Sequence, residues 1–163
     1  MSRVLAIDPG NVDSAFCIVD AESLTPVEFG KVNNKDLAKM IQNEFTYNEF
    51  VIERVASYGM AVGKDIFQTC EWIGRFVQIA SMFYKPIFYI YRKDEKLHIC
   101  GDSRAKDANI RRALIDRFAK HDLKNGKGTR AEPDFFYGFR ADCWSAYAVG
   151  ITFIEAGPSE VEA

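Results

Sequence analysis

The stretch VLAIDPGNVDSAFCIVD, residues 4–20, decides the fold of this chain. It opens with four apolar residues that predict a buried strand, which ends at Asp8 before the chain turns through Pro9 and Gly10. A second apolar run, 15–19, predicts a strand that runs the other way. Because aspartate is a poor strand residue and is costly to remove from water, a carboxylate at the end of a core strand calls for an explanation.

Over the whole chain, the pattern of apolar residues predicts a mixed α/β fold. Strands are expected at 3–8, 14–20, 26–32, 50–53 and 87–91, and helices at about 35–44, 65–84, 104–120 and 139–154. The first three strands form a meander, and the later strands alternate with helices. We therefore expect a five-stranded sheet, a three-strand antiparallel meander plus two parallel strands, flanked by helices.

The length of 163 residues suits one domain, which we expect over 1–154, followed by an acidic, disordered tail over 155–163. The apolar runs are too short to span a membrane and no leader opens the chain, so we expect a cytoplasmic protein. The four cysteines lie far apart without a CxxC pair, which favours reduced thiols over a disulfide framework or a zinc site.

The net charge of −2 hides an uneven distribution of charged residues. Between 92 and 130 there are twelve Lys or Arg and six Asp or Glu, which leaves a local net charge of +6. This segment is a candidate phosphate-binding face, although charge alone is equally consistent with an ordinary solvated helix face.

Three acidic residues interrupt apolar surroundings: Asp8 and Glu53 at the ends of expected strands, and Asp142 in the first turn of the last expected helix. Singly, each has an ordinary structural explanation in a turn, an ion pair or a helix N-terminus. Together they predict a site, because the first and fourth strands of such a sheet are neighbours at its centre and their ends converge. Close carboxylates repel each other unless a cation is held between them, and oxygen ligands without His or Cys favour Mg²⁺ or Mn²⁺.

Four motifs resemble those of the RuvC-type Holliday junction resolvases, which belong to the RNase H-like nuclease superfamily. They are AIDPGN (6–11), VIERV (51–55), GDSRAKDANIRRAL (101–114) and RADCWSAYAVGITF (140–153). Their order and spacing are similar to the family pattern over roughly 3–154, and the stretch 52–76 resembles phage-encoded RuvC-like proteins. A phage-encoded protein would act in the cytoplasm of the host cell.

The resemblance implies an RNase H-like fold and hydrolysis of a phosphodiester in branched DNA, with four-way junctions, flaps and forks as substrates. It also implies two Mg²⁺ or Mn²⁺ ions, with Asp8 bridging both ions and Glu53 and Asp142 each favouring one. Lys106 lies near the position of the family's active-site lysine, so it is expected to neutralise charge that builds on the phosphate.

Basic residues that follow residue 103 are expected to contact backbone phosphates without reading sequence. These residues are Arg104, Arg111, Arg112, Lys120, Lys124, Lys127 and Arg130. Bacterial members of the family place an aromatic wedge just after the catalytic glutamate, where this chain has Ala56. Tyr58 or Met60 is the candidate for that part here.

Phe139 departs from the family pattern, which carries Asp or His three positions before the last Asp. Asp142 would lie one helical turn after Phe139, so the Phe139 ring is expected to face the metals. Either three carboxylates suffice or another acid substitutes. Asp134 is the nearest candidate, with Glu132 and Asp13 behind it.

A junction has paired strands to cut, which favours a two-fold homodimer. The aromatic residues of the long expected helix either form the dimer surface or fill the core, and the sequence favours neither alternative. They are Phe67, Trp72, Phe76 and Phe83.

Other functions remain open at this point. A nuclease acting on ribosomal RNA precursor and one acting on RNA–DNA hybrids share the carboxylate site. A non-catalytic junction-binding module fits the missing fourth acid. An actin-like ATPase also opens with a strand and an Asp-Gly turn, but it needs two such domains, for which this chain is too short.

Overall fold

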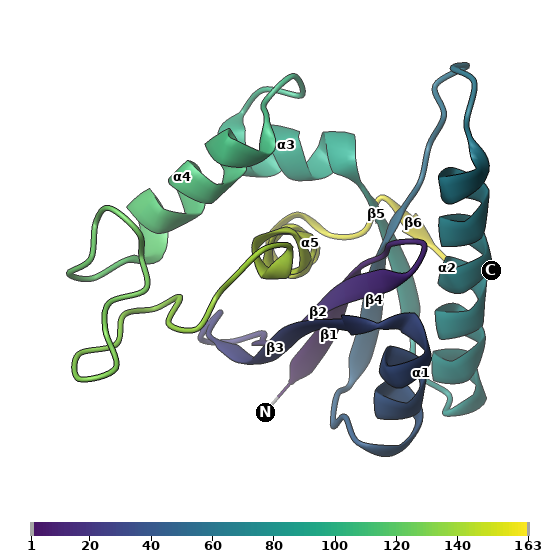
Figure 1. Cartoon of the computed structure of the whole chain (residues 1–163), viewed down its shortest axis with the longest axis horizontal. Coiled ribbons are helices and arrows are strands. Elements are labelled where there is room, and N and C mark those ends of the chain that lie inside the picture. Colours follow the sequence, from purple (N-terminus) through teal and green to yellow (C-terminus); the bar gives the residue numbers. More distant parts are fainter. Residues whose placement is uncertain (1, 163) are drawn as a thin grey trace.

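The computed structural model describes residues 2–162 and has a six-stranded sheet at its centre, in the order β3-β2-β1-β4-β5-β6 (Figure 1). The strands are β1 (Arg3–Asp8), β2 (Asp13–Asp20), β3 (Pro26–Asn33), β4 (Glu49–Arg54), β5 (Ile87–Tyr91) and β6 (Glu160–Val161). β1 to β3 form an antiparallel meander, and β4 and β5 continue the sheet parallel to β1. The mixed α/β class is as predicted, but the prediction of five strands is wrong because the C-terminal segment adds β6 beside β5.

Helices cover both faces of this sheet (Figure 1). They are α1 (Asn34–Asn43), α2 (Lys64–Met82), α3 (Arg92–Cys100), α4 (Asp107–Phe118) and α5 (Cys143–Ala156). α1 and α2 pack on one face, α5 packs on the other, and α3 and α4 lie outside α5. The sequence prediction had no counterpart of α3. No helix within residues 2–162 has the length and apolar character that a membrane crossing requires.

Alternation along the central strands sends Asp8 and Glu53 to the same face of the sheet. On β1, Leu5 and Ile7 belong to the core beneath α1 and α2, whereas Ala6 belongs to the core beneath α5. Asp8 follows Ala6 onto the α5 face, and the same alternation on β4 sends Glu53 there. Both acids therefore lie at the ends of rigid, buried strands and on the face that α5 covers.

Small residues let α5 lie close to the sheet. A Cβ added to Gly150 would lie 3.0 Å from Val19 Cγ2 and 3.2 Å from the Ala6 Cβ. The helix begins at Cys143, four residues later than predicted, and Asp142 immediately precedes it. This approach of α5 to β1 places Asp142 within electrostatic reach of the carboxylate at the end of β1.

The turn after Asp8 is fixed by a buried polar network. Gly10 N–H donates to Ser14 Oγ at 3.0 Å, and the Ser14 hydroxyl is 2.5 Å from Asn34 Oδ1. The Asn34 amide in turn donates to the Gly10 carbonyl at 2.8 Å. Position 10 requires glycine, since an added Cβ would lie 2.2 Å from the Asp13 carbonyl oxygen. The backbone that carries Asp8 is therefore held by the strand on one side and by this turn on the other.

A disordered tail was predicted over 155–163, but the structure shows that this segment continues the fold. β6 pairs with β5, and the Glu160 carboxylate binds Arg54 Nη1 and the Tyr91 hydroxyl, each at 2.6 Å. A strand of two residues is too short to give a periodic signal, so the sequence pattern could not predict it. Ala163 lies outside the described residues.

Candidate active site

Asp8 and Glu53 form a pair of carboxylates at the centre of the sheet. β1 and β4 are parallel neighbours, and their last paired residues, Ile7 and Ile52, immediately precede the two acids. The Asp8 and Glu53 carboxyl groups are close enough to repel each other when both are ionised. Only 13% of the Glu53 side chain is exposed, so the pair has little water to screen its repulsion.

The environment of Asp8 opposes its ionisation. Burial raises the pKa of Asp8 well above its ordinary range, and the neighbouring carboxylates of Glu53 and Asp142 raise it further. Arg92 acts in the opposite direction but does not cancel these effects. The structure thus brings together the three acids that the sequence singled out, and it places Asp8 where a negative charge is unfavourable.

Glu95 is a fourth acid in this cluster, and sequence reasoning missed it. It lies on α3, is fully buried, and is close enough to Glu53 for the two carboxylates to repel each other. Burial raises the pKa of Glu95 well above its ordinary range, and the charge of Glu53 adds to the effect. One weak signal existed: Ile99, one helical turn after Glu95, packs against the core. The charged residues around Glu95 make the helical spacing of Glu95 and Ile99 hard to recognise in the sequence.

Asp142 is held at the N-terminus of α5 by an ion pair that was also not predicted. Lys31 Nζ lies 2.6 Å from Asp142 Oδ2, and this hydrogen bond is the main cause that raises the pKa of Lys31. The two side chains remain partly exposed. Lys31 lies on β3 and is separated from Asp142 by most of the chain, so no local pattern could connect them.

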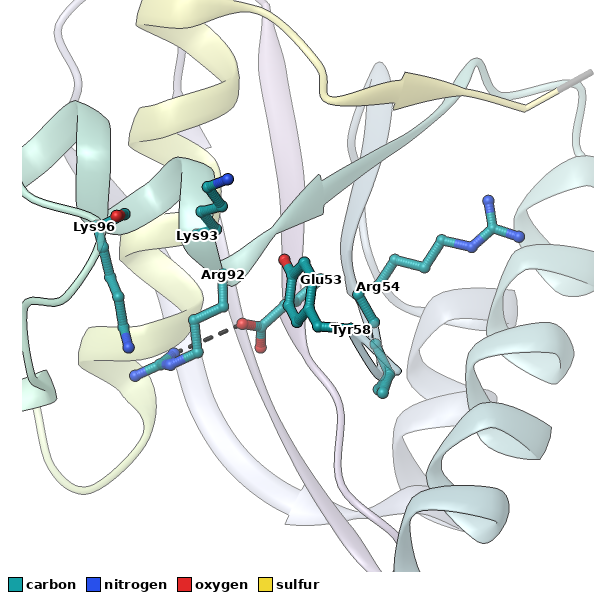
Figure 2. Close-up of a pocket in the computed structure, with 9 residues that line it drawn as sticks. Glu53, Arg54, Tyr58, Arg92, Lys93 and Lys96 are labelled. Atoms are coloured by element: carbon teal, nitrogen blue, oxygen red, sulfur yellow. Dashed lines mark ion pairs between the residues drawn. The ribbon is translucent and has the colours of Figure 1, made fainter. Parts of the chain in front are cut away.

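Arg92 supplies positive charge to the buried acids. It is the first residue of α3, and its Nη1 lies 3.5 Å from Glu53 Oε1. Its guanidinium also pairs with Asp107, the first residue of α4. Figure 2 shows the Arg92 side chain directed toward Glu53. Arg92 therefore connects both outer helices to the carboxylates.

A cavity of about 510 Å³ opens beside Glu53 (Figure 2). Its walls carry four basic residues, Arg54, Arg92, Lys93 and Lys96. Tyr58 also lines it, with an exposed side chain and a left-handed backbone at φ 49°. Basic side chains of this kind are suited to hold a phosphate group, which would then lie next to the carboxylate pair.

The donor atoms of the cluster fit a hard divalent cation. Every ligand on offer is a carboxylate oxygen, and Glu53 Oε1 and both Glu95 oxygens are buried without a hydrogen-bond partner. As they stand, no three Asp, Glu, His or Cys side chains of residues 2–162 are arranged to hold one ion. Holding a divalent ion here would require side-chain movements, for example the release of Asp142 from Lys31 and of Glu53 from Arg92.

The structure gives Asp134 a different role from the predicted one. Its carboxylate accepts hydrogen bonds of 2.7–3.1 Å from the backbone N–H groups of Lys120, His121, Asp122 and Phe135. Burial alone would raise the pKa of Asp134, but these N–H groups together lower it below its ordinary value. Asp134 therefore organises the loop between α4 and α5. Glu132 is exposed in that loop, and Asp13 is exposed at the start of β2.

The prediction that the Phe139 ring faces the carboxylates is wrong, because Phe139 precedes α5 instead of lying on it. The side chain is buried among aromatic residues, with ring centroids 4.5 Å from Phe29, 5.0 Å from Phe136 and 5.1 Å from Trp144. It belongs to the core between α5 and α4. Position 139 therefore serves packing in this chain.

The predicted DNA-binding residues lie on α4, before it and in the following loop. Arg104, Lys106, Arg111, Lys120, Lys124 and Arg130 are exposed, and Lys127 is half-buried. The Arg112 guanidinium is used within the protein, because it binds Asp116 and the carbonyl oxygens of Leu123 and Lys124. Lys106 precedes Asp107, the partner of Arg92, and so stands beside the link from α4 to the carboxylates.

In a metal-free buffer, Asp8→Asn is expected to stabilise the protein at neutral pH. The folded chain holds the Asp8 proton more tightly than the unfolded chain, so folding stability falls as pH rises above the ordinary pKa of 3.8. The amide removes this loss, and a gain of about 1 kcal/mol would raise Tm by about 2–4 °C. Thermal unfolding in EDTA between pH 4 and pH 8 measures the effect. The gain should grow with pH; a variant that is less stable than wild type at pH 8 would contradict it.

Comparison with known proteins identifies the fold. No protein-family model matches this chain, and no curated protein matches its sequence. Among solved structures, that of Thermus thermophilus RuvC has a TM-score of 0.68 at 14% identity, covering 98% of this chain and 99% of the other. T. thermophilus RuvC in complex with a Holliday junction substrate has a TM-score of 0.70 at 11% identity, with 96% of each chain covered. The fold is therefore RuvC-like over almost the whole chain.

Proposed function

We propose that this protein is a metal-dependent endonuclease that hydrolyses phosphodiester bonds in branched DNA, with four-way junctions as the main substrate. One observation carries the proposal: Asp8 and Glu53 end two parallel central strands side by side, and Asp142, just before α5, lies within electrostatic reach of Asp8. The RuvC-like fold supports it, because a structural neighbour at 11% identity is a complex with a Holliday junction. Flaps and forks are further candidate substrates.

The proposed chemistry divides among the residues of the cluster. Asp8, Glu53 and Asp142 hold the divalent ions, Mg²⁺ or Mn²⁺, and orient them toward one phosphate. When bound, two such ions activate the attacking water and stabilise the leaving 3′-oxygen. Lys106 neutralises negative charge on the phosphate as it reacts. Lys31 and Arg92 hold the acids in the absence of cations and thereby limit repulsion among them.

The branched DNA is proposed to lie across the cavity beside Glu53 and along α4. Lys93 and Lys96 line that cavity, and the exposed basic residues of α4 and its following loop extend the positive surface. Tyr58 stands at the rim with an exposed ring, which suits stacking on an unpaired base at the branch point. The sequence placed both lysines in the basic segment 92–130 but did not single them out as DNA contacts.

A second copy of the chain is proposed to pack on α2, because a four-way junction presents paired strands to cut. Of the four aromatic residues named for this surface, Phe76 is fully buried and belongs to the core. Phe67 and Phe83 are exposed, and Trp72 is partly buried against Phe76 at 5.5 Å between ring centroids. The proposed dimer surface therefore consists of Phe67, Trp72 and Phe83.

The double variant Lys93→Ala/Lys96→Ala is expected to bind a four-way junction about 10-fold more weakly at moderate salt. Two lost phosphate contacts should also reduce the slope of log affinity against log salt by about 2. Fluorescence anisotropy across a salt series measures both quantities. Lys35→Ala/Lys39→Ala, on the exposed side of α1 across the sheet, is the matched control and should bind like wild type. Equal losses in both double variants would remove the cavity from the DNA path.

Nicking of a labelled substrate panel with Mg²⁺ or Mn²⁺ tests the proposed function. The panel contains a four-way junction, a flap, a fork, linear duplex, an RNA–DNA hybrid and a structured RNA. We expect metal-dependent nicking of the junction in preference to linear duplex. Preferential cleavage of the hybrid or the RNA would assign the same site to the other nuclease classes, and junction binding without any cleavage would indicate a non-catalytic module.

A further inference from the structure

Glu95 is a buried carboxylate that the fold leaves without a hydrogen-bond partner. Its residue exposure is 0%, and neither Oε1 nor Oε2 has a partner within residues 2–162. A buried carboxylate in this condition is unfavourable and is seldom retained for packing alone, because an apolar residue of similar size would avoid the cost. The position therefore indicates a ligand that the side chain meets in the working protein.

The surroundings of Glu95 show where such a ligand would bind. Its carboxyl group lies beside Glu53, which in turn lies beside Asp8. A second cavity, of about 230 Å³, is lined by both Glu95 and Asp142. Arg92 lines the same cavity and reaches Glu53 at 3.5 Å, so the only guanidinium that pairs with Glu53 within the described residues also borders this space. Glu95 thus joins the acids of β1 and β4 to the acid of α5.

We propose that Glu95 is the fourth carboxylate ligand of the divalent-metal site, supplied from α3 in place of an acid at position 139. This inference rests on the proposed nuclease function. Phe139 fills the aromatic core and Asp134 is engaged by backbone N–H groups, so neither can serve. Glu95 offers two free oxygens of the kind that Mg²⁺ and Mn²⁺ prefer.

The assignment also explains the position of α3. This helix starts directly after β5, so its first residue, Arg92, stands two residues after Ile90 and on the same α5 face. Arg92 then faces Glu53, and Glu95 follows three residues later on the same side of the helix. The Arg92 guanidinium and the Glu95 carboxylate therefore both reach the cluster from one turn of α3. A bound cation would give Glu95 a partner, and Arg92 would keep its ion pair with Asp107 if it left Glu53.

Titration of the full chain with MnCl₂ alone, followed by calorimetry without DNA, tests the proposal. Glu95→Gln should raise the Mn²⁺ dissociation constant by about 10-fold or more, because one anionic ligand is lost. Glu28→Gln, an exposed glutamate on β3, is the matched control and should bind Mn²⁺ like wild type. Mn²⁺ binding by Glu95→Gln at wild-type affinity would overturn the proposal. If the glutamine variant does not fold, Glu95→Asp decides: weaker binding supports the assignment, and unchanged binding overturns it.

The junction-nicking assay separates this inference from the proposed function. A wild-type chain that binds no Mn²⁺ and nicks no junction would remove both. A wild-type chain that binds Mn²⁺ and nicks junctions, together with a Glu95→Gln variant that does both equally well, would remove only the role of Glu95. With the inference correct, Glu95→Gln should need about 10-fold more Mn²⁺ for half-maximal nicking and should keep the wild-type affinity for junction DNA in EDTA.

Discussion

Asp8→Asn, Glu53→Gln and Asp142→Asn should each lower the single-turnover rate of junction nicking by about 10³-fold or more. Each substitution keeps the shape of the side chain but replaces an anionic metal ligand with a neutral amide. Binding of the junction should remain close to that of wild type, because DNA affinity comes from the basic surface and not from these acids. Binding in EDTA and nicking in Mg²⁺ or Mn²⁺ measure the two effects separately.

Glu28→Gln, exposed on β3, is the control for the three amide variants and should nick like wild type. Circular dichroism shows whether each variant is folded. Normal nicking by any one of the folded amide variants would take that residue out of the proposed metal site. Unfolding of all three would make the acids structural and would contradict the account of a carboxylate cluster that serves to hold cations.

Phe139→Asp is expected to cost most of the stability of the fold and to improve no metal site. Removing a buried phenylalanine ring costs about 3–5 kcal/mol, and an unpaired buried carboxylate adds a further penalty. A typical domain has only about 5–15 kcal/mol in total, so a large loss of soluble, folded protein is expected. Thermal unfolding and urea titration measure the change.

Phe139→Leu is the matched control, since it keeps an apolar side chain between Phe29 and Trp144. It should cost about 1–3 kcal/mol and leave the metal requirement of nicking unchanged. A stable Phe139→Asp variant that nicks at lower Mg²⁺ or Mn²⁺ concentration than wild type would contradict the structure. It would support instead the family pattern, in which position 139 faces the metals.

The central sheet was predictable because its signals are local. Apolar runs with turn residues between them define β1, β2 and β4, and an acid at the end of a buried strand is conspicuous in the sequence. The parallel pairing of β1 with β4 then follows from the order of strands and helices, and it brings Asp8 to Glu53. The structure shows the same neighbourhood.

The rest of the site depends on packing that a linear pattern does not contain. α3 has the sequence RKDEKLHIC, and its Glu95 side chain points inward, toward other acids. Because charged residues usually face water, the sequence gives little reason to expect Glu95 in the site. α5 starts later than predicted because Phe139 packs in the core before it and the Asp134 carboxylate accepts backbone N–H hydrogen bonds in the loop between α4 and α5. Lys31 reaches Asp142 only through the folded sheet.

The most direct test of the central claim is the position of Mn²⁺ in crystals of the wild-type chain, located by anomalous scattering. The account predicts Mn²⁺ bound between the carboxylates of Asp8 and Glu53, with the Arg92 guanidinium withdrawn from Glu53. Saturating Mn²⁺ that supports junction nicking in solution but leaves no anomalous signal beside Asp8 in the crystal would contradict the claim.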